Sequence, residues 1–496
     1  MTAPTPGNLA DIVRRSGEGR PDKVALIDGD RTLTYGALDA ACDRMASVLA
    51  GSRAPGDRVA LLLPNSLEFV VGFLGAVRAG GVAVPLSPAF TASELGHQLA
   101  DSGAALVITD PGHAPLATAA AGELPDCEVV TFDPAWLAGG ADPVASSGAG
   151  EDLALILYTA GTSGRPKGAM LSHRALLANL EQVSEIEPPI VAEDDVTLLV
   201  LPLFHVYGLG TGLCLALRTG ATAVLAPDFD PVATLRTVRE AHVTTLIGAP
   251  PMFVAWAMLP DLRESLSSLR LAVSGAAPLS ATVQAQVREA AGVEVYEGYG
   301  LTETAPVLTT TLCSPTPKPG SIGRPIPGVE LRLLDEGGDE VDEDDPGEIT
   351  VRGANLFSGY WPSGSGGPDP EGWWRTGDVA VADGDGDLFL VDRLRELILV
   401  SGFNVYPREV EAVLASHPAV AEVAVVGVPH PYTGETVKAF VVPAADASLS
   451  PGDLVDFAAQ RLARFKCPTA VEIVAELPHS LIGKVARGRL RAGRRD

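Results

Sequence analysis

The chain has 496 residues, of which 46% are hydrophobic and 20% charged, and its formal net charge is −26 at pH 7. This length accommodates two domains, and the composition is that of a globular protein rather than a disordered one. The negative charge repels polyanions at long range and therefore argues against a nucleic-acid partner.

The cysteine pattern and the hydropathy of the sequence indicate the cellular compartment of the protein. The five cysteines are scattered, without the paired spacing of a zinc site or a disulfide framework, which is typical of a reducing compartment. Residues 1–19 lack a continuous apolar segment, and the most apolar stretch, residues 59–84, is interrupted by Pro64, Glu68 and Arg78. We therefore expect a cytoplasmic protein with no signal peptide and no integral membrane segment.

Apolar runs typical of buried strands alternate with amphipathic stretches typical of helices. The runs are, in chain order, RVALLL, AVPL, ALVITD, LALILY, TLLVLP, TAVLA, TTLIGAP, RLAVSGA and VEVYEGYG, and the helical stretches include SLEFVVGFLGAVRAG and SATVQAQVREAAG. The alternation predicts an α/β fold with largely parallel sheets. After Gly328, short strands separated by turns predict a small antiparallel β unit, and a compact α+β segment follows from about Arg393.

The segment Tyr158–Gly168, YTAGTSGRPKG, places small, hydroxyl-bearing and flexible residues in front of Lys167. In such a loop, backbone N–H groups can form a concavity for phosphate oxygens, while hydroxyls donate hydrogen bonds and the ammonium supplies charge. We expect the loop at a strand-to-helix turn, between LALILY and SHRALLANLEQV. It is not a P-loop, and taken alone a flexible surface loop is an equally good interpretation.

Four further motifs follow in a fixed order: GYGLTET from Gly298, WRTGD from Trp374, DRLRELILVSGFNVYPREVE from Asp392 and LPHSLIGKVARGRL from Leu477. Together with the first loop, they closely resemble the signature set of the adenylate-forming enzymes, the superfamily of acyl-CoA synthetases, nonribosomal peptide adenylation domains and luciferases. The resemblance covers nearly the whole chain. It implies a large N-terminal domain of layered α/β subdomains plus the small β unit, residues 1–391, and a small mobile C-terminal α+β domain, residues 393–496, joined by a hinge at Asp392.

The resemblance also implies the activity. A carboxylic acid attacks the α-phosphate of ATP to give an acyl-adenylate, and the thiol of CoA then displaces AMP. ATP, Mg²⁺ and CoA are thus the expected co-substrates and cofactor, beside a small-molecule carboxylic acid. Because these phosphates are polyanions and the protein is acidic, we expect local cationic pockets for them.

By resemblance, Lys484 is the adenylation catalyst that bridges the carboxylate and the α-phosphate; the alternative is a solvent-facing lysine in a basic terminal helix. Asp378 is implied to clamp the ribose hydroxyls, with Arg393 beside the ribose and phosphate, and Glu303 and Thr162 to hold Mg²⁺. The remaining implied nucleotide contacts are Thr159, Gly161, Thr162, Ser163, Gly164, Lys167, Glu297, Gly298, Tyr299 and Thr302.

His205 is the second catalytic candidate, implied to line the acid pocket, although a histidine buried in an apolar run is also a fair interpretation. The implied pocket residues are His205, Tyr207, Gly275, Ala276, Gly298, Ala305 and Pro306. Most are small or apolar, which suits a fatty or aryl tail. The absence of an aspartate after Phe204 argues against an amino-acid substrate, and Gly298, in place of the arginine of malonate-activating relatives, argues against a dicarboxylic acid.

The implied CoA contacts are Arg395, Gly402 and Asn404, on the segment that would replace Lys484 after the small domain rotates. The leading hypothesis is an acyl-CoA synthetase for a medium- or long-chain fatty acid, with an aryl acid such as a cinnamate as the close alternative. Two other hypotheses are an acyl-AMP ligase that loads a carrier protein and a non-catalytic binding descendant of the fold. Further partners considered are a second copy in a homodimer and a protein acyltransferase that modifies Lys484.

Overall fold

The computed structural model describes residues 7–122, 124–138, 142–159, 166–343, 345–393, 396, 398–400, 403–430, 434–445, 447, 449–462, 464–479 and 485–491. The chain divides into two compact units, one of Met1–Glu330 with Arg352–Trp374 and the other of Leu331–Val351 with Arg375–Asp496. Within the described ranges, no helix is both long and apolar enough to cross a membrane. The domain boundary and hinge at Asp392 stay predictions; the backbone of that residue lies within a strand.

Two sheets organise the first unit. The six-stranded sheet has the order β6 (Glu128–Thr131), β5 (Ala104–Thr109), β3 (Arg58–Leu62), β4 (Val82–Pro85), β7 (Leu153–Thr159), β8 (Lys167–Ser172). The nine-stranded sheet has the order β15 (Arg324–Pro325), β14 (Val307–Thr310), β13 (Val295–Gly300), β12 (Leu271–Ser274), β11 (Thr245–Gly248), β9 (Val196–Leu199), β10 (Thr222–Leu225), β1 (Val24–Asp28), β2 (Arg31–Thr34). Neighbouring strands from β13 to β1 pair in parallel, as the alternating pattern predicts.

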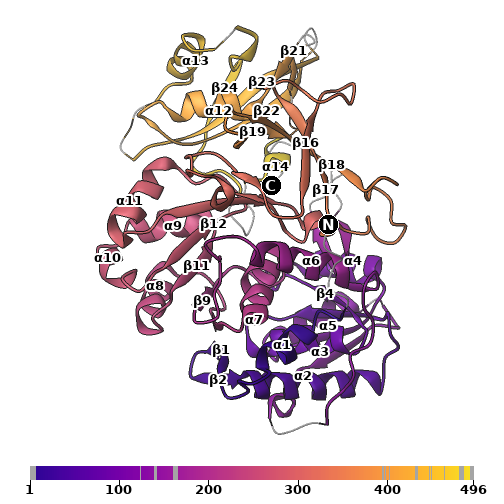
Figure 1. The fold of residues 1–496 in the computed structure, drawn as a ribbon. Coiled ribbons are helices and arrows are strands. Elements are labelled where there is room, and N and C mark those ends of the chain that lie inside the picture. The colour runs from indigo at the N-terminus through magenta and orange to yellow at the C-terminus, as the bar shows by residue number, and fades with distance from the viewer. Residues whose placement is uncertain are drawn as a thin grey trace. The chain divides into compact units, whose positions relative to one another are not determined.

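Helices of the first unit follow most of these strands (Figure 1). They are α1 (Asp11–Gly17), α2 (Tyr35–Ala50), α3 (Leu67–Arg78), α4 (Ala92–Ser102), α5 (Ala114–Ala121), α6 (His173–Ser184), α7 (Leu215–Thr219), α8 (Pro231–Glu240), α9 (Pro250–Ala257), α10 (Leu262–Ser265) and α11 (Ala281–Ala291), with the short helices η1 (Pro134–Leu137), η2 (Tyr207–Cys214), η3 (Thr302–Thr304) and η4 (Thr311–Cys313). Local sequence sets several ends: Thr91 and Glu94 form a capping box before α4, and Gly103 ends that helix at φ +61°.

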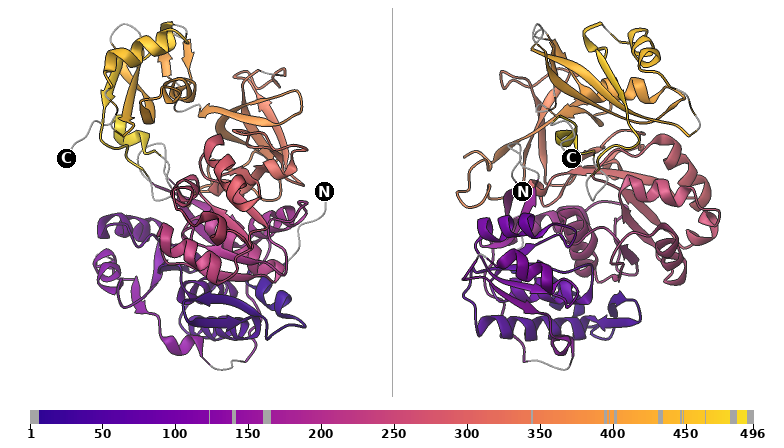
Figure 2. Two further views of the ribbon diagram at one scale, coloured as in Figure 1. Left: turned by 90° about the vertical axis from the view of Figure 1, so that its left-hand side faces the viewer. Right: turned by 180° about the vertical axis from the view of Figure 1, so that it is seen from behind.

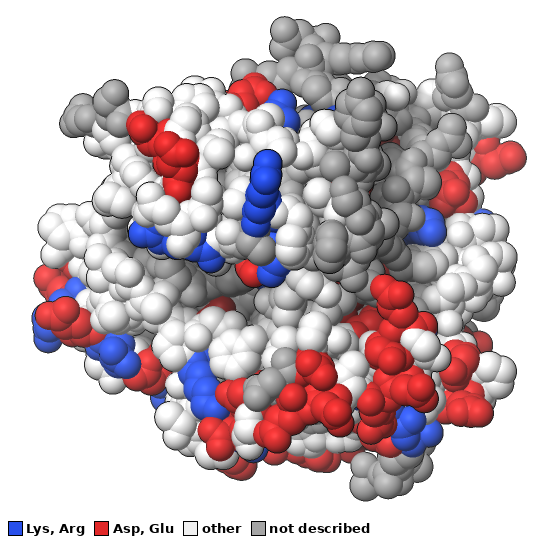
Figure 3. All heavy atoms as spheres, turned by 90° about the horizontal axis from the view of Figure 1, so that it is seen from above, with Lys and Arg blue, Asp and Glu red and all other residues white. Residues whose placement is uncertain are grey.

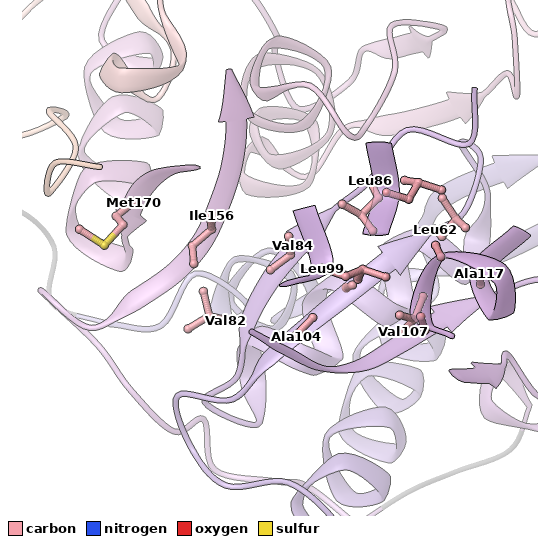
Figure 4. Close-up of a cluster of buried hydrophobic side chains, with 14 residues drawn as sticks. Leu62, Val82, Val84, Leu86, Leu99, Ala104, Val107, Ala117, Ile156 and Met170 are labelled. Carbon is pink, nitrogen blue, oxygen red and sulfur yellow. The ribbon is translucent and has the colours of Figure 1, made fainter. Parts of the chain in front are cut away.

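The six-stranded sheet buries an apolar core against α4 and α5. Val84, Val107 and Ile156 from three strands lie with Leu99 of α4 and Ala117 of α5, each at most 1% exposed (Figure 4). Strands that are buried in this way read as continuous apolar runs, because no side of the strand faces water. This is why VALLL and LALILY could be identified as strands from sequence.

The second unit holds two sheets. A four-stranded sheet has the order β16 (Glu330–Leu334), β17 (Gly347–Arg352), β18 (Trp373–Ala382), β19 (Leu388–Arg393). A five-stranded sheet contains β20 (Ile398–Val400), β21 (Phe403–Val405), β22 (Val420–His430), β23 (Gly434–Pro443) and β24 (Ala470–Ile473). Helices α12 (Pro407–Ala415) and α13 (Pro451–Ala459) pack on this sheet, which Figure 2 shows in yellow tones; η5 (Arg464–Lys466) and α14 (Arg487–Arg491) complete the unit.

One local expectation is wrong. The loop that begins at Tyr158 does not lead from a strand straight into a helix: it joins two antiparallel strands, because Tyr158 pairs with Gly168 and Thr159 with Lys167. The physical reason is that Gly168–Ser172 is fully buried and completes the sheet as β8 before α6 begins. The loop is therefore a hairpin connection whose second strand starts at the lysine.

Candidate active site

The phosphate-loop motif is positioned by its two flanking strands. Thr159 ends β7 and Lys167 begins β8; they are paired across the hairpin, and the Thr159 hydroxyl donates to the Lys167 carbonyl at 3.5 Å. Lys167 is exposed. The candidates Gly161, Thr162, Ser163 and Gly164 lie outside the described residues, so the structure fixes where the loop starts and ends.

A second segment, residues 358–361, runs along the outer edge of β8, and we call it the edge segment. Its backbone is registered to β8 by three hydrogen bonds: Ser358 N–H to the Met170 carbonyl at 2.9 Å, Met170 N–H to the Gly359 carbonyl at 3.1 Å, and Trp361 N–H to the Gly168 carbonyl at 2.8 Å. Tyr360 and Ala169 form the matching bridge. The edge segment thus has a fixed position relative to Lys167.

Glu303, the proposed magnesium ligand, lies on η3 and is 8% exposed. The Tyr360 hydroxyl donates to its Oε1 at 2.7 Å, and the Phe357 N–H donates to its backbone carbonyl at 3.0 Å. The Nζ of Lys167 lies 5.1 Å from the centre of the Tyr360 ring, within the range of a cation–π contact. Tyr360 therefore contacts two residues that are predicted for the nucleotide site, the cation Lys167 and the carboxylate Glu303.

The motif GYGLTET is held at the carboxyl end of β13. Gly300 is required there, because a Cβ would lie 1.8 Å from the Pro306 carbonyl oxygen. Gly298 is less restricted, since its Cβ would lie 3.6 Å from the nearest heavy atom. Tyr299 is on the same strand and Thr302 begins η3, so these two predicted nucleotide contacts start from neighbouring positions.

Glu297 serves the framework in this structure. It is 6% exposed, and its carboxylate accepts hydrogen bonds from the Leu279 N–H at 3.0 Å and from the Gln284 amide at 2.6 Å. Burial raises the pKa of Glu297 above its ordinary value. Its carboxylate therefore links β13 to the loop before α11; the predicted nucleotide contact of this residue stays a prediction.

Among the predicted acid-pocket residues, Tyr207 of η2 contacts Gly275, and Pro306 packs against the same helix. A Cβ at Gly275 would lie 2.8 Å from Cζ and 2.9 Å from Oη of Tyr207, so that ring ends directly against the glycine. The Tyr207 hydroxyl is buried and has no hydrogen-bond partner among the described residues. His205 precedes the helix, and its Nδ1 accepts from the Tyr207 N–H at 3.2 Å. On the same helix, a Cβ at Gly210 would lie 3.0 Å from the Pro306 ring.

Two alanines of the predicted pocket have left-handed backbones: φ is +72° at Ala276 and +64° at Ala305. Residues with a Cβ rarely adopt this conformation, and such strain is concentrated at functional sites. Ala305 adopts this conformation as the residue that ends η3, and the assignment of both alanines to the pocket lining stays a prediction.

In the second unit, Asp378 is 3% exposed and lies on β18 directly opposite Arg393 of β19. The turn before it is fixed by Glu348, whose carboxylate accepts from the Gly377 N–H at 3.0 Å and pairs with Arg375. The Asp378 N–H donates to the Thr376 hydroxyl at 3.1 Å. The register agrees with the expected partnership of Asp378 and Arg393, although the Arg393 side chain lies outside the description.

Several predicted residues fall beyond what the structure describes. Lys484 is flanked by His479 and Val485, which form an antiparallel bridge, but it is itself outside the described residues. The same holds for Arg395 and Gly402, and for the side chains of Asp392 and Asn404. These assignments stay predictions.

The residue that sequence reasoning missed is Tyr360. It precedes WPSGSGGPDPEGW, which reads only as an exposed loop. The one available signal was an aromatic pair, Tyr360 and Trp361, at the start of a polar and glycine-rich stretch, and this signal says nothing about a contact with Glu303.

Surface charge is strongly acidic. On the face drawn in Figure 3, acidic side chains gather along one margin and basic ones are fewer and scattered. This agrees with the net charge of −26. A polyphosphate site on such a protein needs specific cations, because the general field of the protein repels anions.

Comparison with known proteins identifies the family. Residues 13–361 match the family model for the AMP-binding enzyme, and residues 409–484 match the model for the AMP-binding enzyme C-terminal domain. A feruloyl-CoA synthase from an Amycolatopsis species is 39% identical over 483 residues, covering 95% of this chain and 96% of the relative. A long-chain-fatty-acid–CoA ligase from Escherichia coli O157:H7 is 35% identical over 530 residues, covering 98% and 94%.

Solved structures that resemble this chain agree with the family assignment. ATP-bound MatB from Rhodopseudomonas palustris has a TM-score of 0.90 and 34% identity, and the match covers 98% of this chain and 99% of the other. The predicted α/β fold class, the resemblance to adenylate-forming enzymes and the expected enzyme class are confirmed. The chain therefore belongs to the AMP-binding enzyme family and is an AMP-forming acid–thiol ligase.

Proposed function

We propose that this protein uses ATP and Mg²⁺ to activate a monocarboxylic acid as its acyl-adenylate and then transfers the acyl group to CoA, releasing AMP and pyrophosphate. The observation that carries the proposal is the meeting of Lys167 and Glu303 on Tyr360 within one unit. A cation for phosphate oxygens and a carboxylate for a divalent metal are the groups that phosphoryl chemistry requires.

The first step brings a carboxylate anion to a polyphosphate, so catalysis depends on positive charge where negative charge accumulates. Lys167 would neutralise phosphate oxygens beside β8, and Lys484 would bridge the attacking carboxylate and the α-phosphate. Glu303 would hold Mg²⁺, which lowers the charge of the phosphates when bound. Asp378 would fix the ribose, because a carboxylate can accept from two hydroxyls.

For the acid substrate, one feature of the structure favours an aryl acid over the fatty acid, which is the leading hypothesis from the sequence. The buried Tyr207 hydroxyl ends against Gly275 without a hydrogen-bond partner among the described residues. A buried hydroxyl without a hydrogen-bond partner costs free energy unless the bound acid supplies that partner. An acid whose tail carries a polar group therefore fits better than one with an alkyl chain. The 39% identity to a feruloyl-CoA synthase supports the same choice. The 35% identity to a long-chain-fatty-acid–CoA ligase keeps the fatty acid as the second candidate.

The test measures acid-dependent exchange of labelled pyrophosphate into ATP, then CoA-ester formation, with hexanoate, palmitate, benzoate, cinnamate and 4-hydroxycinnamate. We expect exchange only when acid is present and the highest kcat/KM for 4-hydroxycinnamate. A preference for palmitate would select the fatty acid instead. Acyl transfer to a phosphopantetheinylated carrier but not to CoA would select the carrier-loading enzyme, and nucleotide binding without exchange for any acid would contradict the proposal.

Lys484→Ala provides the matching variant. We expect it to lose at least about 100-fold in pyrophosphate exchange, because removing one preorganised charge from an active site has an effect of this size. Full exchange in the variant would remove Lys484 from its assigned role. The cytoplasmic location, the hinge at Asp392, the CoA contacts, the homodimer and the acyltransferase partner also remain predictions.

A further inference from the structure

The edge segment ties two parts of the site that are distant in sequence. Through its backbone it is registered to β8, the strand that begins with Lys167. The Tyr360 hydroxyl of this segment donates to the carboxylate of Glu303, and the N–H of Phe357, the residue just before the segment, donates to the backbone carbonyl of Glu303. A shift of either element would therefore be transmitted to the other through a short, hydrogen-bonded stretch of chain.

The Tyr360 side chain is itself rigidly packed. Its ring meets Phe357 edge-on, with centroids 5.1 Å apart, and a Cβ at Gly366 would lie 3.1 Å from the ring. The Tyr360 N–H donates to the Ser365 carbonyl at 2.9 Å, and its carbonyl accepts from the Gly364 N–H at 2.8 Å. A ring held on these sides offers a fixed face to the Lys167 ammonium and a fixed hydroxyl to Glu303.

We propose that Tyr360 is a positioning residue for nucleotide binding: its hydroxyl orients Glu303 for Mg²⁺, and its ring face holds Lys167 beside the phosphates. The inference rests on the proposed function and adds a residue to it. The two contacts use different parts of one side chain, so they can be removed separately. Tyr360→Phe removes only the hydroxyl, whereas Tyr360→Leu removes the hydroxyl and the aromatic face.

The experiment is equilibrium binding of ATP, measured by isothermal titration calorimetry over a series of Mg²⁺ concentrations and in EDTA, which requires no turnover. A hydrogen bond to a charged group contributes enough for us to expect about a tenfold higher half-saturating Mg²⁺ concentration in Tyr360→Phe, with ATP affinity in EDTA unchanged. Tyr360→Leu should show that shift and, in addition, about a threefold to tenfold loss of affinity in EDTA, because the cation–π contact is gone.

Tyr35→Phe is the matched control. Its hydroxyl is also buried and donates to the Ala221 carbonyl at 2.7 Å, outside the proposed site. We expect that variant to bind ATP with the wild-type Mg²⁺ requirement, so a general effect of losing a buried hydroxyl is separated from positioning. Urea unfolding of each variant establishes that it is folded.

The outcomes separate the inference from the function on which it rests. If the wild-type protein binds ATP and exchanges pyrophosphate while Tyr360→Phe keeps the wild-type Mg²⁺ requirement, the positioning role is refuted. Equal shifts in Tyr360→Phe and Tyr35→Phe would refute it as well. If the wild-type protein shows no acid-dependent exchange, the proposed function itself fails.

Discussion

Tyr207→Phe should raise the stability of the protein and lower its selectivity for an acid with a polar tail. The substitution removes one hydroxyl that is buried against Gly275 and has no partner among the described residues, and it leaves the ring in place. An unsatisfied buried polar group costs about 1–3 kcal/mol, and replacing it with an apolar group of the same shape recovers that cost. We therefore expect the free energy of unfolding to rise by about 1–3 kcal/mol.

The same change should weaken recognition of a polar acid. Loss of one neutral hydrogen bond of about 1.4 kcal/mol lowers kcat/KM for 4-hydroxycinnamate relative to cinnamate about tenfold. The assays are urea unfolding of the ligand-free protein and the ratio of the two kcat/KM values. Tyr35→Phe is again the control, because its hydroxyl is bonded to Ala221 and its loss should destabilise the protein by about 1 kcal/mol. A Tyr207→Phe protein that is less stable than wild type, or equally selective, would refute the reasoning.

Three further predictions concern stability. Burial lowers the pKa of His173 to about 4, below the ordinary 6.5. As the pH falls, the histidine is therefore protonated first in the unfolded state. The contribution of the neutral His173 to the free energy of unfolding is fully present above about pH 6.5 and is reduced by about 3 kcal/mol toward pH 4. His173→Asn, which keeps an acceptor for the Leu9 N–H, should remove this dependence in urea titrations at several pH values, and an unchanged slope would contradict it. Asp43→Ala should lower the free energy of unfolding by about 3–5 kcal/mol, because it removes a carboxylate 2.7 Å from Arg78, whose side chain is 0% exposed. Glu264→Ala, which removes an exposed carboxylate, should lower it by under about 1 kcal/mol. Equal losses of stability in the two variants would contradict this prediction. Ala276→Gly should stabilise the protein by about 1 kcal/mol in the same assay by relieving the left-handed strain at φ +72°, and a destabilised variant would show that the strain is absent.

The strands could be predicted because they are buried on both faces and leave continuous apolar runs in the sequence. The strand β8 was missed for a local reason: KGAMLS begins with the lysine of the phosphate motif, and its pairing with β7 is settled by the sheet rather than by its own pattern. The motifs located the candidate residues in the chain, because a motif reports on chain neighbours, but the roles of those residues stay predictions. The family resemblance pairs Asp378 with Arg393, and the strand register places their backbones opposite each other; a contact between the two side chains stays a prediction.

Contacts between distant segments could not be predicted in this way. Tyr360 is 57 residues from Glu303, and their hydrogen bond exists only because the edge segment returns to the sheet beside β8. A second example is the buried hydroxyl of Tyr207, which has no hydrogen-bond partner in the described part of the chain. The sequence places a tyrosine in an apolar run, whereas its approach to Gly275 depends on how η2 packs against the carboxyl end of β12.

Glu297 and Glu303 show why a motif alone does not assign chemistry. Both belong to one short stretch around β13, and both are almost completely buried, at 6% and 8% exposure. The Glu297 carboxylate binds a backbone N–H and an amide from the loop before α11 and from α11 itself, which commits it to holding the strand in place. The Glu303 carboxylate instead receives the hydroxyl of a side chain that also contacts Lys167. Our proposal therefore places the metal on Glu303, whose carboxylate shares Tyr360 with Lys167, rather than on Glu297, whose carboxylate holds β13 to α11.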